Sequence, residues 1–255
     1  MKRTAYMFLA PFLIFMLFMV VIPLVMLLFH AFDGGFGYFR EVFEDGFPMR
    51  LLGRSVWIAL VATAICMVIA FPIAYGLTMA GFKRGRTILL LFTLPLWTNL
   101  MLRSFSLRQA FRLFGMSYEG LVPLLIAMVY NFLPLMILPM YIVLGNIDKK
   151  HIEASRDLGA SPFQVFRKTV LPLSVPGIIA GFVLVFIPAV STMWLSDFFG
   201  DNSTFMFGQH LDAVFRQGNF GQGSVLSLIL LVIIALSIFI LNRFSKIGNK
   251  RGGLW

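Results

Sequence analysis

Long apolar stretches alternate along this chain with short polar segments that are rich in lysine and arginine. Six of the stretches approach the roughly 20 residues that a helix needs to cross the hydrocarbon core of a bilayer. They are Ala5–Ala31, Ser55–Ala80, Thr87–Leu102, Leu121–Leu144, Ser174–Ser196 and Ser224–Asn242. The pattern predicts an all-α integral membrane protein with six transmembrane helices.

The composition supports the same class. Of the 255 residues 59% are hydrophobic and 13% charged, and the mean hydropathy is +0.89. Soluble domains have about half apolar and about a quarter charged residues. A cytosolic enzyme, a secreted disulfide-bonded protein and a disordered tail are therefore excluded. Cys66 is the one cysteine and lies in an apolar stretch, so an intrachain disulfide is excluded as well.

The net charge of +10 follows the topology of the chain. With the N-terminus inside, most of the 21 lysine and arginine residues fall on the cytoplasmic segments, as expected for a multi-pass protein of the cell (inner) membrane. Both termini are then cytoplasmic. Because the basic residues are spread over four separate inner segments, nucleic-acid binding is not expected. The first stretch is longer than a signal-peptide core and no small-residue cleavage site follows it, which favours an uncleaved helix.

Five prolines fall within the predicted spans. They are Pro72, Pro95, Pro134, Pro139 and Pro188. Each removes a backbone hydrogen bond, and in lipid the freed carbonyl must find a partner in the protein or in water. Several broken helices together favour a translocation pathway, although any single proline is equally compatible with a packing role.

Residues 146–172, between the fourth and fifth spans, have the local chemistry of two short helices. Asp148 is suited to cap the first helix, and Gly159 can adopt the left-handed conformation that ends it. Ser161 is suited to cap the second, with Pro162 at its first position and Gln164 completing a capping box. We expect Pro172 to stop the second helix before the fifth span. Such a well-specified cytoplasmic hairpin is expected to contact another protein.

The same segment carries a recognisable motif. Glu153-Ala154-Ser155, followed by Gly159 and then by Leu171-Pro172, resembles the EAA loop of the permease subunits of ATP-binding-cassette importers. Ser155 replaces the second alanine, which is a small-for-small change. The longer string from Glu153 to Ser161 is similar to the branch of these importers that transports polyamines, iron or molybdate.

Further blocks narrow the resemblance within residues 55–245. They are Leu94–Asn99 with Arg103, Pro172–Gly181, and Leu195-Ser196-Asp197. Together they resemble the B-type permease subunit of spermidine/putrescine importers. The connection over residues 103–120 is shorter than this resemblance implies.

The resemblance implies the type I importer permease fold and a division of the chain. Residues 1–54 would form the first transmembrane helix and an outer loop, residues 55–245 the permease domain with its coupling loop at 146–172, and residues 246–255 a cytoplasmic tail. It also implies a dimer of ATPase subunits, a second, homologous permease subunit that forms a heterodimer with this chain, and an external substrate-binding protein.

In such importers a short coupling helix of this loop lies in a groove of the ATPase. The residues carried over to that role are Glu153, Ala154, Ser155, Arg156, Asp157 and Gly159. Glu153 would pair with a basic residue or a backbone donor of the ATPase; the alternative is a solvated carboxylate that pairs with Arg156 on its own helix. The chain has no G-x-x-x-x-G-K-[ST] motif and no Cys/His metal spacing. We therefore expect no enzyme activity, cofactor or metal in this chain, with ATP and Mg bound by the partner ATPase.

A pathway for polyamines needs acceptors for ammonium groups and aromatic faces for cation–π contacts. The residues of those types near the pathway blocks are Trp97, Asn99, Tyr130, Asn131, Trp194 and Asp197. The tryptophans are equally compatible with interfacial anchors, and Asp197 with a solvated loop.

Outer charged residues have two readings. Arg103, Arg108 and Arg112 are expected outside, where a cationic substrate must enter, and they argue mildly against a polyamine. Alternatively, they would meet acidic residues of the external binding protein. The outer cluster Glu41, Glu44 and Asp45 would steer cations or that protein, although a solvated loop is the simpler reading.

Two alternative functions remain open at this point. The first is a permease of the same branch for another solute, such as iron(III) or thiamine. The second is a membrane-embedded enzyme or assembly factor, which would need polar residues clustered at one depth.

Overall fold

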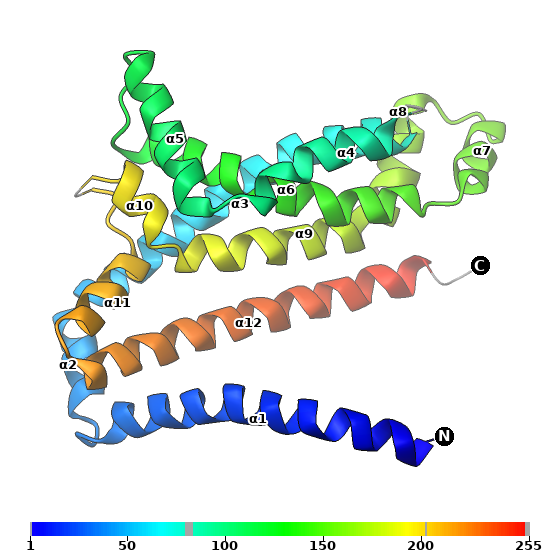
Figure 1. Cartoon of the computed structure of the whole chain (residues 1–255). Coiled ribbons are helices and arrows are strands. Elements are labelled where there is room, and N and C mark those ends of the chain that lie inside the picture. Colours follow the sequence, from blue (N-terminus) through cyan, green and yellow to red (C-terminus); the bar gives the residue numbers. More distant parts are fainter. Residues whose placement is uncertain (1, 80–83, 202, 253–255) are drawn as a thin grey trace. The chain divides into compact units, whose positions relative to one another are not determined.

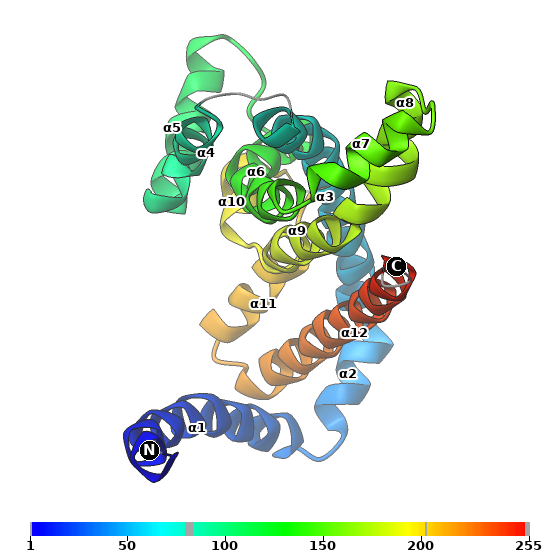
Figure 2. The ribbon, with the colours of Figure 1, turned by 90° about the vertical axis from the view of Figure 1, so that its right-hand side faces the viewer.

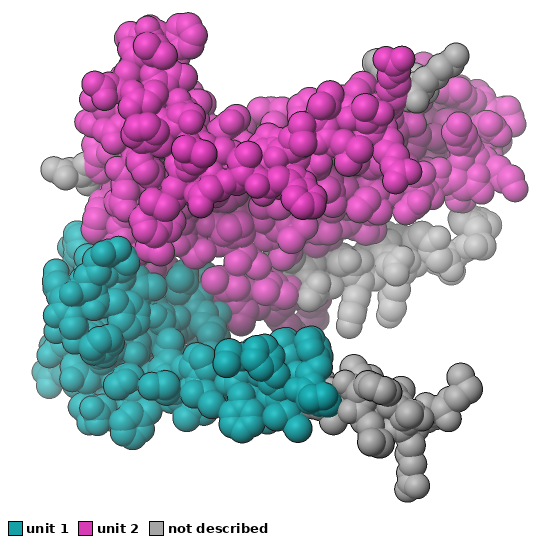
Figure 3. Space-filling model, viewed as in Figure 1, with its two compact units in different colours: residues 1–50, 210–233 teal, residues 51–209, 234–255 magenta. Residues whose placement is uncertain are grey.

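The computed structural model describes residues 2–79, 84–201 and 203–252, and these residues form helices joined by turns, with no strand among them. They separate into two compact units, which Figure 3 colours. One unit contains residues 1–50 and 210–233, and the other contains residues 51–209 and 234–255. Each unit is described by itself below.

The first unit is built around an aromatic corner. It contains α1 (Lys2–Phe32), α2 (Gly37–Asp45), most of α11 (Phe207–Arg216) and the start of α12 (Phe220–Gly252). The ring of Phe32 lies 5.7 Å from that of Phe36 and 5.2 Å from that of Phe39, between ring centroids. Gly221 lies so close to Tyr38 that a Cβ atom there would overlap the ring. The phenylalanine contacts thus pack α1 against α2, and the contact of Tyr38 with Gly221 packs α2 against the start of α12.

The second unit contains most of α3 and the elements that follow it. Their bounds are α3 Phe47–Met79, α4 Gly85–Thr93, η1 Leu94–Trp97, α5 Leu100–Leu113, α6 Leu121–Gly145, α7 Lys149–Asp157, α8 Pro162–Val165, η2 Phe166–Val170, α9 Leu171–Ser191 and α10 Trp194–Phe199. Figure 1 and Figure 2 both show α6 and α9 side by side.

Two glycines of α9 allow this close approach. A Cβ atom at Gly177 would lie 2.9 Å from Cβ of Val143, and one at Gly181 would lie 2.6 Å from Sδ of Met136. Val143 and Met136 both belong to α6. Small residues four positions apart are the usual device by which membrane helices bring their backbones together, because lipid offers no hydrophobic drive for helix association.

Five of the six predicted spans are present as single helical segments, and the third is broken. Five helical segments are long and apolar enough to cross a membrane; they are Ile14–Phe32, Phe47–Met79, Leu121–Gly145, Pro162–Ser191 and Phe220–Ile240. A sixth span is available only if Gly85–Trp97 and Leu100–Leu113 count together, and these two pieces are bent by 98°. The span predicted over Thr87–Leu102, with Pro95 interrupting it, is therefore a bent pair whose second piece continues to Leu113. Of the five prolines in predicted spans only Pro95 lies at such a break, since the others sit inside α3, α6 and α9.

The fifth span also differs from the prediction. It begins at Pro162, so Pro172 does not stop the preceding helix, and it ends at Ser191 rather than at Ser196. The π-turn η2 immediately precedes Pro172, and the N–H of Leu171 bonds to the carbonyl of Phe166, five residues back. This wider turn shifts the hydrogen-bond register, which lets the chain accept a proline that an ordinary α-helix would not.

Two predicted boundaries fall at the limits of the described chain. Ala80, the expected end of the second span, lies outside the described residues. In the expected tail 246–255, residues 246–252 continue α12, and residues 253–255 lie outside the described part.

Candidate coupling surface and translocation pathway

The hairpin over residues 146–172 begins with the cap that was predicted. The carboxylate of Asp148 accepts a hydrogen bond of 3.0 Å from the backbone N–H of Lys150, which satisfies one free donor at the start of α7. The helix ends at Gly159, whose φ of +79° lies in the left-handed region. The N–H of Ala160 bonds to the carbonyl of Ser155, and the N–H of Gly159 bonds to that of Arg156. This is the pattern of a Schellman motif, in which glycine is the residue without steric cost.

The second helix of the hairpin, α8, begins with two reciprocal capping hydrogen bonds. Oγ of Ser161 accepts from the N–H of Gln164 at 3.4 Å, and Oε1 of Gln164 accepts from the N–H of Ser161 at 2.9 Å. Pro162 occupies the first turn of the helix. The predicted capping box is confirmed, so the turn between α7 and α8 is specified by its own residues.

Ser155 connects the two halves of the hairpin. Its Oγ lies 2.8 Å from Oγ1 of Thr169 and donates to the carbonyl of His151 at 2.8 Å. Thr169 belongs to the π-turn that leads directly into α9. The serine that stands at the motif's second alanine position therefore attaches α7 to the start of the fifth span.

A small cavity lies between α7 and the end of α3. It has a volume of about 220 Å³, and its α7 side is formed by Lys149, Ile152, Glu153 and Arg156. Glu153 makes no ion pair with Arg156 or with any other described residue. Its carboxylate is exposed and remains available to a partner.

The outer surface of the hairpin carries two exposed apolar side chains. Leu158 is 89% exposed and Phe163 is 68% exposed. Both lie beside the Schellman turn, and Figure 1 shows α7 beyond the end of α9. An exposed leucine and phenylalanine on an otherwise polar hairpin are typical of a protein-docking surface.

The candidate pathway residues of the third span lie at its break. Trp97 ends the 3₁₀ turn η1 and is 88% exposed. Asn99 has extended backbone and caps α5, because its Oδ1 accepts from the N–H of Met101 at 2.8 Å. Sequence reasoning assigned Asn99 to solute contact and did not anticipate the cap, although an asparagine directly before a helical segment is the usual signal for one.

A cavity of about 420 Å³ adjoins this break. It is lined by Leu91, Leu94, Pro95, Thr98, Leu102, Arg103, Ser106 and Tyr130. Tyr130 is 43% exposed and is the one candidate pathway residue in this lining. Trp97 and Asn99 lie on the same turn but are not part of the lining.

Arg103 was expected outside, where it would meet the binding protein, but its side chain is buried within this chain. Its side chain is 9% exposed, and its Nε and Nη1 atoms are buried without a hydrogen-bond partner among the described residues. The bend at Pro95 continues the span into α5, so Arg103 lies one turn inside a helix rather than in an outer loop. Arg108 is half-buried, pairs with Glu119 at 3.4 Å and lies over the ring of Tyr118.

Asn131 is buried and connects two helices. Its Nδ2 donates to the carbonyl of Ala127 at 2.9 Å and to Oγ of Ser104 at 3.4 Å. The second bond joins α6 to α5. Its predicted place along the pathway stays a prediction, while its contacts are those of a packing residue.

Trp194 and Asp197 lie on α10, which packs against α5 and α6. Asp197 is exposed and accepts a hydrogen bond from Gln209. In the next loop the carboxylate of Asp201 accepts bonds from the side chains and N–H groups of Ser203 and Thr204, and these bonds lower the pKa of that carboxyl. The loop after α10 is therefore organised around an ionised aspartate.

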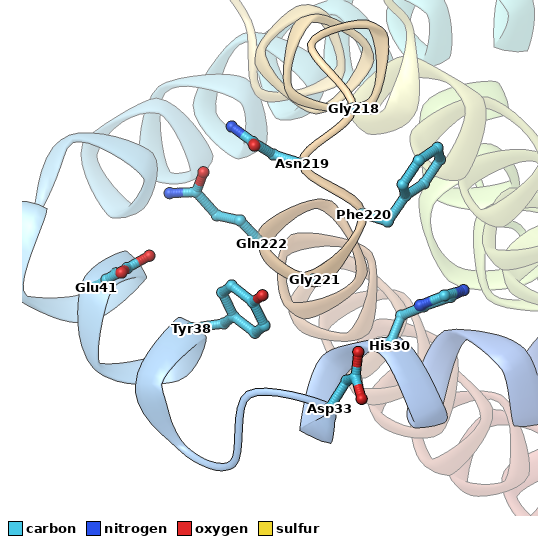
Figure 4. Close-up of a pocket in the computed structure, with 9 residues that line it drawn as sticks. All are labelled: His30, Asp33, Tyr38, Glu41, Gly218, Asn219, Phe220, Gly221 and Gln222. Atoms are coloured by element: carbon cyan, nitrogen blue, oxygen red, sulfur yellow. The ribbon is translucent and has the colours of Figure 1, made fainter.

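The first unit contains an acidic pocket that sequence reasoning missed. It has a volume of about 540 Å³, and Figure 4 shows Tyr38 between the carboxylates of Asp33 and Glu41. The remaining lining residues are His30, Gly218, Asn219, Phe220, Gly221 and Gln222, and no lysine or arginine is among the nine. Glu41 was considered only with Glu44 and Asp45 along the chain, and the approach of α12 could not be seen in that pattern.

The fold and hairpin define a class of membrane transport subunit. A sequence model of the family described as "Binding-protein-dependent transport system inner membrane component" matches residues 1–251. The chain belongs to this family. It is an inner-membrane, multi-pass permease, and the class of protein is a transport subunit.

Individual relatives have names that specify the transported solute more closely than the family description does. The chain is 31% identical to the spermidine/putrescine transport system permease protein PotB of Haemophilus influenzae over 263 residues, which covers 92% of each chain. It is 32% identical to PotB of Escherichia coli over 226 residues, covering 81% of this chain and 82% of that protein. The inner membrane ABC transporter permease protein YdcU of Escherichia coli is 26% identical over 220 residues, covering 74% and 70%.

Solved structures establish the fold. A bacterial alginate ABC transporter in complex with an alginate pentasaccharide-bound periplasmic protein matches with a TM-score of 0.73 at 14% identity, covering 96% of this chain and 94% of that chain. The MetNI methionine ABC transporter in inward-facing conformations matches with a TM-score of 0.64 at 20% identity, covering 78% and 95%. The predicted type I importer permease fold is confirmed.

Proposed function

We propose that this chain is the permease subunit of an ATP-driven importer that moves spermidine and putrescine across the inner membrane. The observation that carries the proposal is the similarity to PotB proteins over most of both chains. The distribution of lysine and arginine residues supports a topology with both termini in the cytoplasm. In this topology the hairpin between α6 and α9 lies on the cytoplasmic side, and the acidic pocket of the first unit lies outside.

The hairpin is the docking site for the ATPase dimer, which binds ATP and Mg. Leu158 and Phe163 supply its apolar contacts, and Glu153 supplies an unpaired carboxylate. The Schellman turn at Gly159 fixes the direction in which these side chains project. Movement of the ATPase then reaches the fifth span through the contact of Ser155 with Thr169.

Two further partners complete the proposed importer, one on the outer side of the membrane and one within the membrane. An external binding protein would deliver the polyamine, and a second, homologous permease would complete the pathway. Trp97 and Tyr130 present exposed aromatic faces near the bend of the third span. Such faces attract ammonium groups by about 0.5–2 kcal/mol each, which is enough to guide a polyamine without trapping it.

Uptake of labelled spermidine and putrescine tests the proposal. In cells that lack every other polyamine importer, deletion of this chain should abolish uptake, and a plasmid copy should restore it. Unchanged uptake would disprove the polyamine assignment. Uptake of iron(III) and thiamine in the same strains tests the alternative solutes of this branch.

Co-purification tests the ATPase contact separately. Replacing Leu158 by Asp should release the ATPase from the tagged permease, because a carboxylate would enter an apolar interface. The matched control is Phe114→Asp, which changes an equally exposed apolar residue at the end of α5. Retention of the ATPase by the Leu158→Asp variant would contradict docking at this surface.

A further inference from the structure

In the second unit, the guanidinium of Arg103 is buried at two of its three nitrogen atoms. Its Nε and Nη1 atoms are buried and have no partner among the described residues. Its side chain borders the 420 Å³ cavity at the break of the third span, and none of the eight lining residues is acidic. A buried charge without a partner is strongly unfavourable, so an anion from outside this chain is required to complete the site.

The backbone beside Arg103 also needs surroundings other than lipid. The two helical pieces of the third span meet at 98°, and the turn between them is irregular from Leu94 to Asn99. Irregular backbone at membrane depth is found where protein covers it or where it lines a water-filled cavity, and not where it faces lipid. The break therefore opens onto water or onto a neighbouring protein surface, and the exposed leucines of the cavity lining favour the second.

The surroundings of the cavity match a membrane-protein interface. Leu91, Leu94 and Leu102 line it and are exposed in this chain. A neighbouring helix would cover these leucines while placing one acidic side chain opposite the guanidinium. Ion pairs between helices are the common arrangement for charged residues within membrane spans.

We propose that Arg103 receives an aspartate or glutamate side chain from the second permease subunit, and that this ion pair holds the two permeases together at the break of the third span. The proposal rests on the proposed function, which supplies the second subunit. It adds the contact residue and the chemistry of its partner. Arginine suits this role because its planar guanidinium stays charged and bonds carboxylates directionally.

Retention of the second permease tests this contact in the assembled importer. The importer is purified through a tag on this chain, and the amount of the second permease is measured after a detergent wash. Arg103→Met should lower retention by at least about tenfold, because it leaves a carboxylate buried and unpaired. The matched control is Arg108→Met on the same helix, whose arginine already pairs with Glu119 of its own chain and should change retention less than about twofold.

A charge exchange identifies the partner residue. In the Arg103→Glu background, each acidic residue within the membrane spans of the second permease is replaced in turn by Arg. One of these exchanges should restore retention, and the same exchange alone should weaken it. If Arg103→Met does not accumulate in the membrane, this rescue decides by itself, since rescue of accumulation also requires the correct pair.

Three results would overturn the proposal. They are normal retention in Arg103→Met, absence of rescue by any single exchange, and loss of a bound anionic phospholipid from Arg103→Met while the pair stays intact. The last result would assign the site to a lipid phosphate. None of them bears on spermidine uptake by the unaltered chain, so failure of this contact is distinguishable from failure of the proposed function.

Discussion

The hairpin over residues 146–172 and the broken third span begin their helices in the same way but complete them differently. Asp148 and Asn99 both have extended backbone, and each accepts a bond from the N–H two residues later. In the hairpin the next bonds also come from residues within five positions, at Gly159 and Ser161. In the third span Ser104 is contacted by Asn131, 27 residues away, and Arg103 has no partner in the chain. The hairpin is thus locally self-sufficient, whereas the break depends on its neighbours.

The largest effect is expected at the end of α7. A β-branched residue at Gly159 would be strained at φ +79°, by about 1–3 kcal/mol, although no atom lies within 4 Å of its Cβ position. Gly159→Val should therefore turn the docking surface away and lower polyamine uptake more than about tenfold, with normal insertion. The control is Gly53→Ala, a helical glycine that also has open space around it. Uptake equal to the control would show that the turn does not orient the docking surface.

The second-largest effect is expected where α6 packs against α9, a contact between residues far apart in the sequence. Gly177→Ala places a methyl group against Cβ of Val143, which is attached directly to the backbone and cannot move away. Gly181→Ala meets the sulfur of Met136, which is the flexible part of that side chain. Thermal unfolding in detergent should show destabilisation of about 1–3 kcal/mol for Gly177→Ala and clearly less for Gly181→Ala. Equal losses of stability in the two variants would mean that the helices move apart as a whole, rather than that the side chain of Met136 moves aside.

The two N-caps allow the most direct comparison. Asp148→Ala and Asn99→Ala each remove one cap bond, and each should cost about 1 kcal/mol of stability. Ser at either position keeps the cap. Asn99→Ser should therefore restore stability, and spermidine uptake by this variant separates the two roles of the residue. Uptake that recovers fully assigns Asn99 to capping alone, and uptake that stays low adds solute contact.

The smallest effect is expected where Ser155 meets Thr169. Ser155→Ala restores the alanine typical of the motif but removes a hydrogen bond worth about 0.5–1.5 kcal/mol. ATP hydrolysis should continue, while the number of polyamine molecules transported per ATP should fall by about twofold to tenfold. Ser191→Ala is the control, because the hydroxyl of Ser191 bonds only within its own helix. An unchanged number of polyamine molecules per ATP would show that the contact of Ser155 with Thr169 does not couple ATP hydrolysis to transport.

Local signals explain which parts of the candidate site could be predicted. The caps at Asp148 and Ser161 and the glycine end at Gly159 were visible because each bond joins residues two to five positions apart. The role of Asn99 as a cap was equally local, but Asn99 was assigned to solute contact within the predicted span Thr87–Leu102, so no helix start was considered there. Burial of Arg103 and the bond from Asn131 to Ser104 had no local signal, since both depend on how α5 lies against α6.

The sequence by itself determined the membrane class, the number of apolar spans, the family and the hairpin with its caps. These features depend on hydropathy summed over about 20 residues and on bonds within one or two helical turns. Only the tertiary structure decided that the third span bends by 98°, that the fifth span runs through Pro172, and that Tyr38 closes an acidic pocket against α12. A proline permits a bend, a π-turn or a straight helix. Which of these forms depends on where neighbouring helices can satisfy the freed backbone groups and fill the space beside them.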